Sequence, residues 1–174
     1  MQEYLDKLES WAELIGPNLY LQAAVIVLVA VLVGKIADLI VSNFIGRLAK
    51  RSSTPFDDEL VAILHRPVFL SFVLAGLGFA TMRLSLPAGP HFVTTALLKT
   101  IATFVWLVFL LRFVRVIVRS LNERAEDKLL QARMLPLIQN VAQITVFALG
   151  AYFLFLAWNI DVTAWLASAG IVGL

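Results

Sequence analysis

The residue types that most often carry catalysis or bind metals are few in this chain, and they are not grouped. There is no cysteine, which excludes disulfides, thiolate nucleophiles and cysteine-ligated metals. The two histidines, His65 and His91, are expected on opposite sides of a membrane and cannot share a site. Asp57, Asp58 and Glu59 are consecutive, so on a helix they point in different directions and compensate the helix dipole. The sequence therefore predicts neither an enzyme nor a metal site, and no cofactor.

Three arginines form the clearest charged motif. Arg112, Arg115 and Arg119 recur at spacings of three and four residues, which places them on one face of a helix where an apolar segment ends. Such a stripe attracts anionic lipid headgroups, at about 1 kcal/mol per residue near the surface. The same residues would also serve as a simple marker of topology, and the sequence leaves both interpretations open. Because no aromatic residues interleave with basic ones on a soluble face, nucleic-acid binding is not expected.

Other charges fall inside apolar segments, where they are costly and invite a functional interpretation. Lys35 and Asp38 are three residues apart, and we interpret them as a local pair with a snorkelling ammonium group. Lys99 either snorkels to the outer interface or lines a pathway through the membrane.

The composition is that of a membrane protein. Apolar residues make up 60% of the 174 residues and charged residues 15%, whereas soluble domains have about half and a quarter. The long apolar runs are near or above the roughly 20 residues that cross ~30 Å of hydrocarbon. We predict an all-α integral membrane protein whose four transmembrane helices cover residues 19–45, 67–84, 92–118 and 135–158.

The N-terminal segment has a different pattern. Residues 1–15 place their apolar side chains on one helical stripe with the acids opposite, and Gly16 and Pro17 end the pattern. We predict an amphipathic helix within residues 1–17 that lies in the outer membrane interface. The acidic composition of this segment argues against a cleavable signal peptide.

The first loop contains a second helix signal. Thr54, Pro55 and Asp57 follow the order that a helix start prefers: a hydroxyl cap, a proline and then an acid. The sequence predicts a short helix from Pro55 to His65, and Pro67 is expected to begin the second span.

The loops also predict the orientation. Most of the 14 Lys and Arg residues lie between the first and second spans or between the third and fourth. By the positive-inside rule both loops are cytoplasmic and the N-terminus is outside. Trp11, Tyr20, Trp158 and Trp165 then fall at the outer interface, as expected of an aromatic belt.

The final segment, residues 163–174, is too short to span, because about 12 helical residues reach only ~18 Å. It is rich in small residues, which let helix backbones approach closely in a membrane. It carries no charge, so a ring of several copies would enclose a narrow apolar constriction that gates by dewetting.

These C-terminal features carry a resemblance to a known family. "MLPLIQNVAQITVFALGAYFLFLAW" (134–158) and "NIDVTAWLASAGIVGL" (159–174) resemble the penultimate membrane helix, the outer turn and the start of the pore helix in the small-conductance mechanosensitive channel (MscS-like) family. The stretch "TPFDDELVAILHRP" resembles a segment of members with extra N-terminal helices. Gly170 and Gly173 fall on glycines of the family's pore helix, and Leu174 falls at about its first apolar ring. Ala169 and Val172 depart from the residue sizes that are usual there.

The resemblance implies a homoheptamer opened by membrane tension. Residues 92–174 would form the channel core, with a tension-sensing helix pair over 92–158 and a truncated pore helix over 163–174, and residues 18–91 would form an additional hairpin. The pore-lining or pore-packing residues would be Ala169, Gly170, Gly173 and Leu174. Because the family continues into a cytoplasmic domain, the chain is expected to be the membrane portion of a longer protein.

The function expected from these features is a tension-gated channel in the bacterial cytoplasmic (inner) membrane. It would release ions and small osmolytes on osmotic downshock, with membrane lipids and copies of itself as partners. Two alternatives stay open. One is a secondary transporter, for which Lys99 and the group Gln139, Asn140 and Gln143 offer the only polar candidates. The other is a non-conducting membrane assembly domain.

Overall fold

The computed structural model describes residues 18–49, 55–124, 134–163 and 167, and within these residues it contains helices and no strand. The helices are α2 (Leu19–Ala49), α3 (Pro55–Arg83), α4 (Ala88–Arg124) and α5 (Leu135–Ala157). All four are long and apolar enough to cross a membrane. This confirms the prediction of an all-helical chain with four such helices. The N-terminal helix expected over 1–17 lies outside the described residues, and the final segment 163–174 is described only at Thr163 and Ala167.

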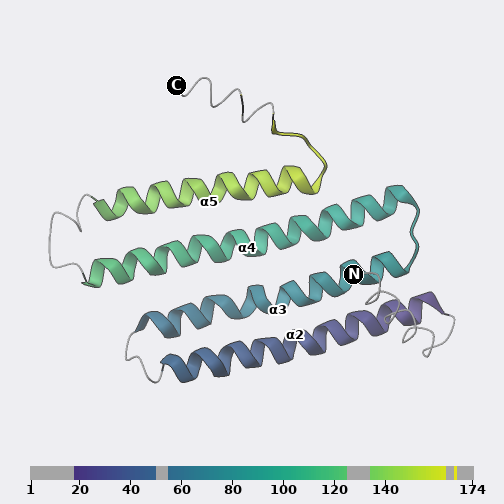
Figure 1. Ribbon diagram of the computed structural model, residues 1–174, viewed down its shortest axis with the longest axis horizontal. Coiled ribbons are helices and arrows are strands. Elements are labelled where there is room, and N and C mark those ends of the chain that lie inside the picture. The colour runs from purple at the N-terminus through teal and green to yellow at the C-terminus, as the bar shows by residue number, and fades with distance from the viewer. Residues whose placement is uncertain (1–17, 50–54, 125–133, 164–166, 168–174) are drawn as a thin grey trace.

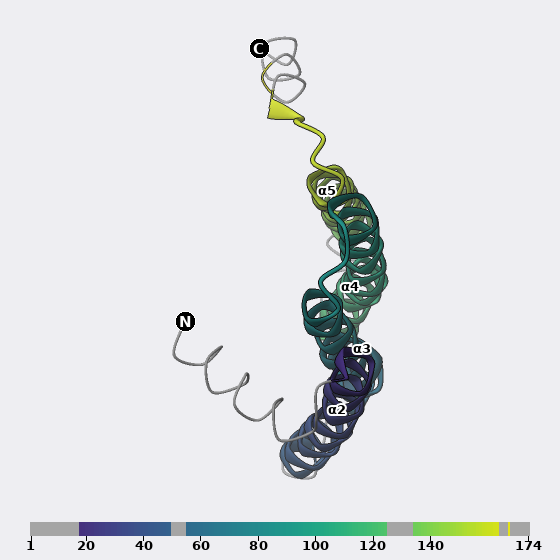
Figure 2. The same ribbon diagram turned by 90° about the vertical axis from the view of Figure 1, so that its right-hand side faces the viewer.

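The four helices lie side by side in chain order and form a single layer (Figure 1). α2 packs on α3, α3 on α4, and α4 on α5. Seen along the helices, the layer is a curved row and not a closed bundle (Figure 2). Among the described residues no large side chain is fully buried, and the core consists mostly of Ala, Val and Leu. As far as the described helices go, both faces of the layer are therefore open along most of its length.

The open layer follows from the way apolar residues are distributed around each helix. In α5, for example, Val146 is buried whereas Ile138, Val141 and Ile144 are exposed. A helix that is apolar on all sides has no polar face to turn toward water. In a bilayer such helices gain little by collapsing into a bundle, because lipid tails are as apolar as their side chains. Local contacts between neighbours are then enough to define the row.

The predicted break at Pro67 is wrong. The structure has one continuous helix from Pro55 to Arg83 with Pro67 inside it, instead of a short helix ending at His65. Pro67 is buried, and the Ser71 hydroxyl donates a hydrogen bond to its carbonyl oxygen at 2.7 Å. Proline lacks one backbone donor, but within an apolar segment the remaining backbone groups have no water to bond and stay paired within the helix.

The helices also extend past the predicted spans. α2 continues to Ala49 and α4 runs from Ala88 to Arg124, beyond the expected 19–45 and 92–118. Hydropathy marks the apolar part of a helix and not the point where its hydrogen bonding ends, so polar ends such as that of α4 were missed. The gap expected between the second and third spans, residues 85–91, is shorter in the structure, because only residues 84–87 separate α3 from α4. Ser85 takes a left-handed conformation there, with φ 47°.

Candidate functional site

The predicted arginine stripe lies on α4 with all three side chains exposed. Arg119 is nearest to another charge: its Nη1 is 3.7 Å from Oε1 of Glu59 on α3. The two side chains are 68% and 43% exposed, so solvent screens this contact and it contributes little to stability. The stripe is thus presented outward from the layer near the end of α4.

The arginines continue a longer exposed stripe that the sequence analysis did not identify. Seven exposed residues follow one another along α4 at spacings of three or four, which defines one helical face. They are Leu97, Ile101, Phe104, Val108, Arg112, Arg115 and Arg119. We call this set the α4 stripe. Its apolar part covers about 16 Å, close to the depth of one leaflet of a ~30 Å hydrocarbon core.

Two polar contacts join α2 to α3. Nε of Arg83 donates to Oε1 of Gln22 at 2.9 Å, and Gln22 is only 5% exposed. Further along α2, Nδ1 of His65 and a carboxylate oxygen of Asp38 form a hydrogen bond. The two contacts are roughly 24 Å apart along α2.

The partner of Asp38 differs from the sequence interpretation. Asp38 was interpreted as pairing with Lys35 on the same helix, whereas the structure pairs it with His65 of α3. Lys35 is exposed, and among the described residues no contact to Asp38 is found for it. A pairing between residues 27 positions apart leaves no periodic signal in the sequence. Only the presence of one polar residue on each of two neighbouring spans, at matching depth, could have suggested this pairing.

Tryptophan side chains join the remaining helix pairs. Nε1 of Trp106 on α4 donates to the Ser71 hydroxyl on α3 at 3.1 Å. Nε1 of Trp158, at the end of α5, donates to the Thr100 hydroxyl on α4 at 3.0 Å. The Phe92 ring meets Trp158 edge to face, with centroids 6.3 Å apart. The sequence predicted Trp158 at a membrane interface; what the structure shows is that its side chain joins the end of α5 to α4.

The turn after α5 has a defined cap. Asn159 has a left-handed backbone with φ 54°, and its N–H donates to Leu156 O at 3.2 Å. Ile160 N–H donates to Phe155 O at 2.9 Å. Together these bonds form a Schellman motif, with Asn in the position that glycine most often takes. The helix therefore stops at this point.

A second local bond follows directly. The backbone N–H of Thr163 donates to Oδ1 of Asp161 at 2.8 Å. Hydrogen bonds from the Thr163 side chain and backbone hold the pKa of the exposed Asp161 carboxyl below its ordinary value of 3.8. Asp161 is thus an acceptor at the start of the final segment, as an ionised aspartate is at many helix starts.

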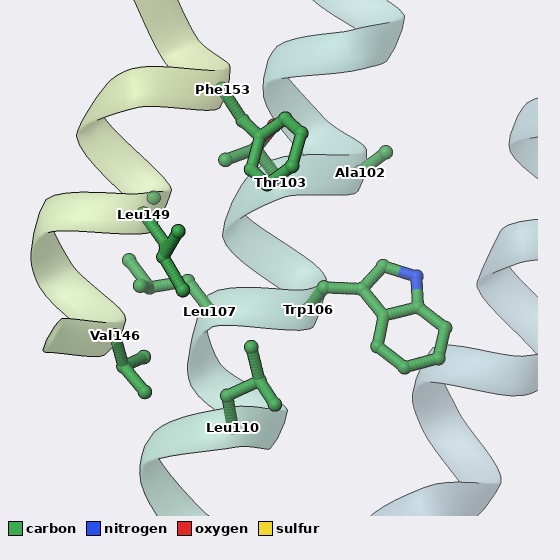
Figure 3. A pocket seen from close by; sticks show the side chains of 9 residues that line it. Ala102, Thr103, Trp106, Leu107, Leu110, Val146, Leu149 and Phe153 are labelled. Carbon is green, nitrogen blue, oxygen red and sulfur yellow. The ribbon is translucent and has the colours of Figure 1, made fainter. Parts of the chain in front are cut away.

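α4 and α5 leave an apolar cavity between them of about 290 Å³ (Figure 3). The side chains of Leu107, Val146 and Leu149 project into the space between the two helices, and the Trp106 ring extends toward the α3 side. Gly150 forms part of the wall, where a Cβ atom would lie 2.7 Å from Leu107 Cδ1. A methyl group at this position would require the Leu107 side chain to shift.

The other predicted site residues cannot be placed. Ala169, Gly170, Gly173 and Leu174 lie outside the described residues. Within the described ranges, no group of three or more His, Asp or Glu side chains is arranged to hold a metal ion.

Comparison with known proteins adds no assignment: no protein-family model, no curated protein and no solved structure matches this chain. The described part of the chain is a row of four helices, each able to cross a membrane, with an exposed stripe on α4 that changes from apolar to cationic. These features are consistent with a multi-pass membrane protein.

Proposed function

We propose that this chain is the membrane portion of a mechanosensitive channel that is opened by membrane tension and releases ions and small osmolytes on osmotic downshock. The single-layer arrangement of α2 to α5 carries the proposal (Figure 2). Tension reaches a protein through the lipids that touch it. A layer with open faces lets lipids contact every helix, whereas a closed bundle shields much of its surface.

The α4 stripe supports the same proposal. A helix that moves under tension must exchange lipid contacts. The α4 stripe offers exposed apolar side chains to acyl chains and exposed arginines to anionic headgroups, with Arg119 also 3.7 Å from Glu59. Each exposed arginine near the surface contributes about 1 kcal/mol of attraction to anionic lipid. In this proposal α4 and α5 are the tension-sensing pair, and residues 163–174 start the pore helix through Ala169, Gly170, Gly173 and Leu174.

The assembly and location belong to the same proposal. We place the chain in the bacterial inner membrane with the N-terminus outside, because the arginines then face the cytoplasm and Trp158 lies at the outer interface. The resemblance of residues 134–174 to the MscS-like family favours a homoheptamer. Counting the copies in purified full-length protein tests this point, and a monomer would exclude a pore formed by a ring.

Patch-clamp recording of the full-length protein in liposomes is the deciding experiment. We expect pressure-activated currents whose threshold shifts in the double variant Arg112→Gln/Arg115→Gln. Arg66→Gln is the matched control, because Arg66 is also exposed but lies on α3, off the α4 stripe. Correctly inserted protein without pressure-activated current would refute the channel. Substrate-driven flux without pressure dependence would indicate a secondary transporter instead.

A further inference from the structure

The cavity between α4 and α5 presents an apolar surface. Two of the side chains that line it, Thr103 and Trp106, are polar, but their donors are used elsewhere. Its volume of about 290 Å³ is at the small end for ligand pockets. A single segment of a hydrocarbon chain fits this volume better than a bulky ligand does. The Thr103 hydroxyl donates to Lys99 O at 2.9 Å, and Trp106 Nε1 donates to Ser71. Both donors are therefore engaged within the protein. The walls offer carbon surface, so the occupant that fits is a hydrocarbon chain.

The depth of the cavity can be measured along α5. With 23 residues, α5 is ~34 Å long, slightly more than a ~30 Å hydrocarbon core. Val146 lies at its middle, and Phe153 lies about 10 Å closer to Trp158. The cavity thus occupies the acyl region of the leaflet on the Trp158 side.

A cation stands above the cavity on the same helical face. Lys99 precedes Thr103 by four residues and Trp106 by seven, so the three share one stripe of α4. Thr100, the neighbour of Lys99, accepts the hydrogen bond from Trp158. This contact places Lys99 level with the end of α5, at the depth where headgroups begin. Lys99 is exposed, and among the described residues it has no carboxylate partner.

We propose that Lys99 and this cavity form a binding site for an anionic phospholipid of the leaflet on the Trp158 side. One acyl chain occupies the cavity beside Trp106, and the phosphate contacts the Lys99 ammonium group. The site is separate from the α4 stripe, because Lys99 and Val108 lie about 180° apart around the helix. This lipid site gives Lys99 a role beyond snorkelling. The site depends on the four helices spanning a membrane and not on channel activity.

Quenching of tryptophan fluorescence by brominated lipid chains tests the site. The full-length protein is reconstituted in phosphatidylcholine vesicles that contain a minor fraction of brominated-chain phosphatidylglycerol or, in parallel, brominated-chain phosphatidylcholine. The Trp106 contribution is the difference between the wild type and Trp106→Phe. We expect phosphatidylglycerol to occupy the site about fivefold more favourably, the effect of one cation near the surface.

The variants separate the headgroup contact from the chain contact. Lys99→Met should abolish the fivefold preference, whereas Lys35→Met, an exposed lysine on α2, should keep it. Leu149→Phe narrows the cavity from an exposed position and should reduce Trp106 quenching by both lipids. Phosphatidylglycerol retained in native mass spectrometry should fall in Lys99→Met and not in Lys35→Met, which provides a readout independent of Trp106.

Equal quenching by the two lipids in the wild type would overturn the proposal. So would a preference that survives Lys99→Met but is lost in Arg112→Gln/Arg115→Gln, since the anionic lipid would then occupy the α4 stripe. Neither result depends on pressure-activated current, so failure of this site and failure of the proposed channel can be distinguished.

Discussion

Gly76 of α3 lies directly against Ala30 of α2. A Cβ atom built on Gly76 would come within 2.1 Å of Ala30 Cβ, so only a hydrogen atom fits between the two helices. Gly78, two residues further along α3, has nothing within 4 Å of the same position. These two glycines of one helix differ in a single respect, the presence of a neighbouring helix, and they form a matched pair for testing the contact between α2 and α3.

Gly76→Ala should destabilise the α2–α3 pair by about 1–3 kcal/mol, because overpacking a close contact displaces both backbones. Gly78→Ala adds its methyl group in open space and should be neutral or slightly stabilising, since alanine favours the helix over glycine. Reversible unfolding in detergent–SDS mixtures measures both. Equal effects of the two substitutions would mean that α2 and α3 do not meet at Gly76.

Asp38 and His65 should be energetically coupled. Removing one partner leaves the other half-buried without its hydrogen bond, which costs about 1–3 kcal/mol. A double-mutant cycle of Asp38→Ala and His65→Ala should therefore give a clear coupling energy. The same cycle between Lys35→Ala and Asp38→Ala serves as the control and should give a value near zero. A coupling energy that is larger for Lys35 and Asp38 than for His65 and Asp38 would instead support a local pair within α2.

The cap of α5 predicts a contrast at Asn159. Asn159→Gly should be tolerated or mildly stabilising, because glycine adopts positive φ without steric cost. Asn159→Val should destabilise the turn by about 1–2 kcal/mol, since a residue with a branched Cβ resists this conformation. Unfolding of the two variants under the same detergent conditions measures the difference. Similar stabilities would show that the Schellman geometry is absent.

Asp161 predicts a pH dependence for the turn that follows. Its pKa is lowered from 3.8 by hydrogen bonds from the Thr163 side chain and backbone, so the folded turn favours the ionised carboxylate. The contribution to stability is fully present above the ordinary pKa and is lost as pH falls through the lowered one. Titration of the Asp161 side-chain carbon by NMR should give a pKa below 3.8 in the wild type and a higher value in Thr163→Ala. An identical Asp161 pKa in the two proteins would exclude the hydrogen bond from the Thr163 side chain.

The sequence was sufficient to predict the four helices because each is a long apolar run, and length and hydropathy alone identify such runs. It failed at Pro67, where a rule drawn from water-exposed helices was applied to a helix in an apolar setting. The arginine stripe was predicted from spacing. The same spacing, followed back from Arg112 to Leu97, would also have shown the apolar part of the α4 stripe.

Contacts between helices were beyond prediction. Nothing in the residues near Gln22 points to Arg83, and nothing near Asp38 points to His65, because each pairing depends on which spans are neighbours and at what depth they meet. Likewise, the cavity beside Gly150 depends on the register of α5 against α4. The sequence contains many glycines, and only the packing distinguishes Gly76 and Gly150 from Gly78.

The single row of helices also determines how the protein shares its boundary with the bilayer. Neighbouring helix axes lie ~8–10 Å apart, so four in a row extend roughly 25–30 Å between the first and last axes but only one helix across. Such a row has a much longer perimeter than a four-helix bundle of the same mass. It therefore contacts more lipid molecules per residue. The thickness and composition of the surrounding membrane should accordingly affect its folded stability as strongly as substitutions within the chain do.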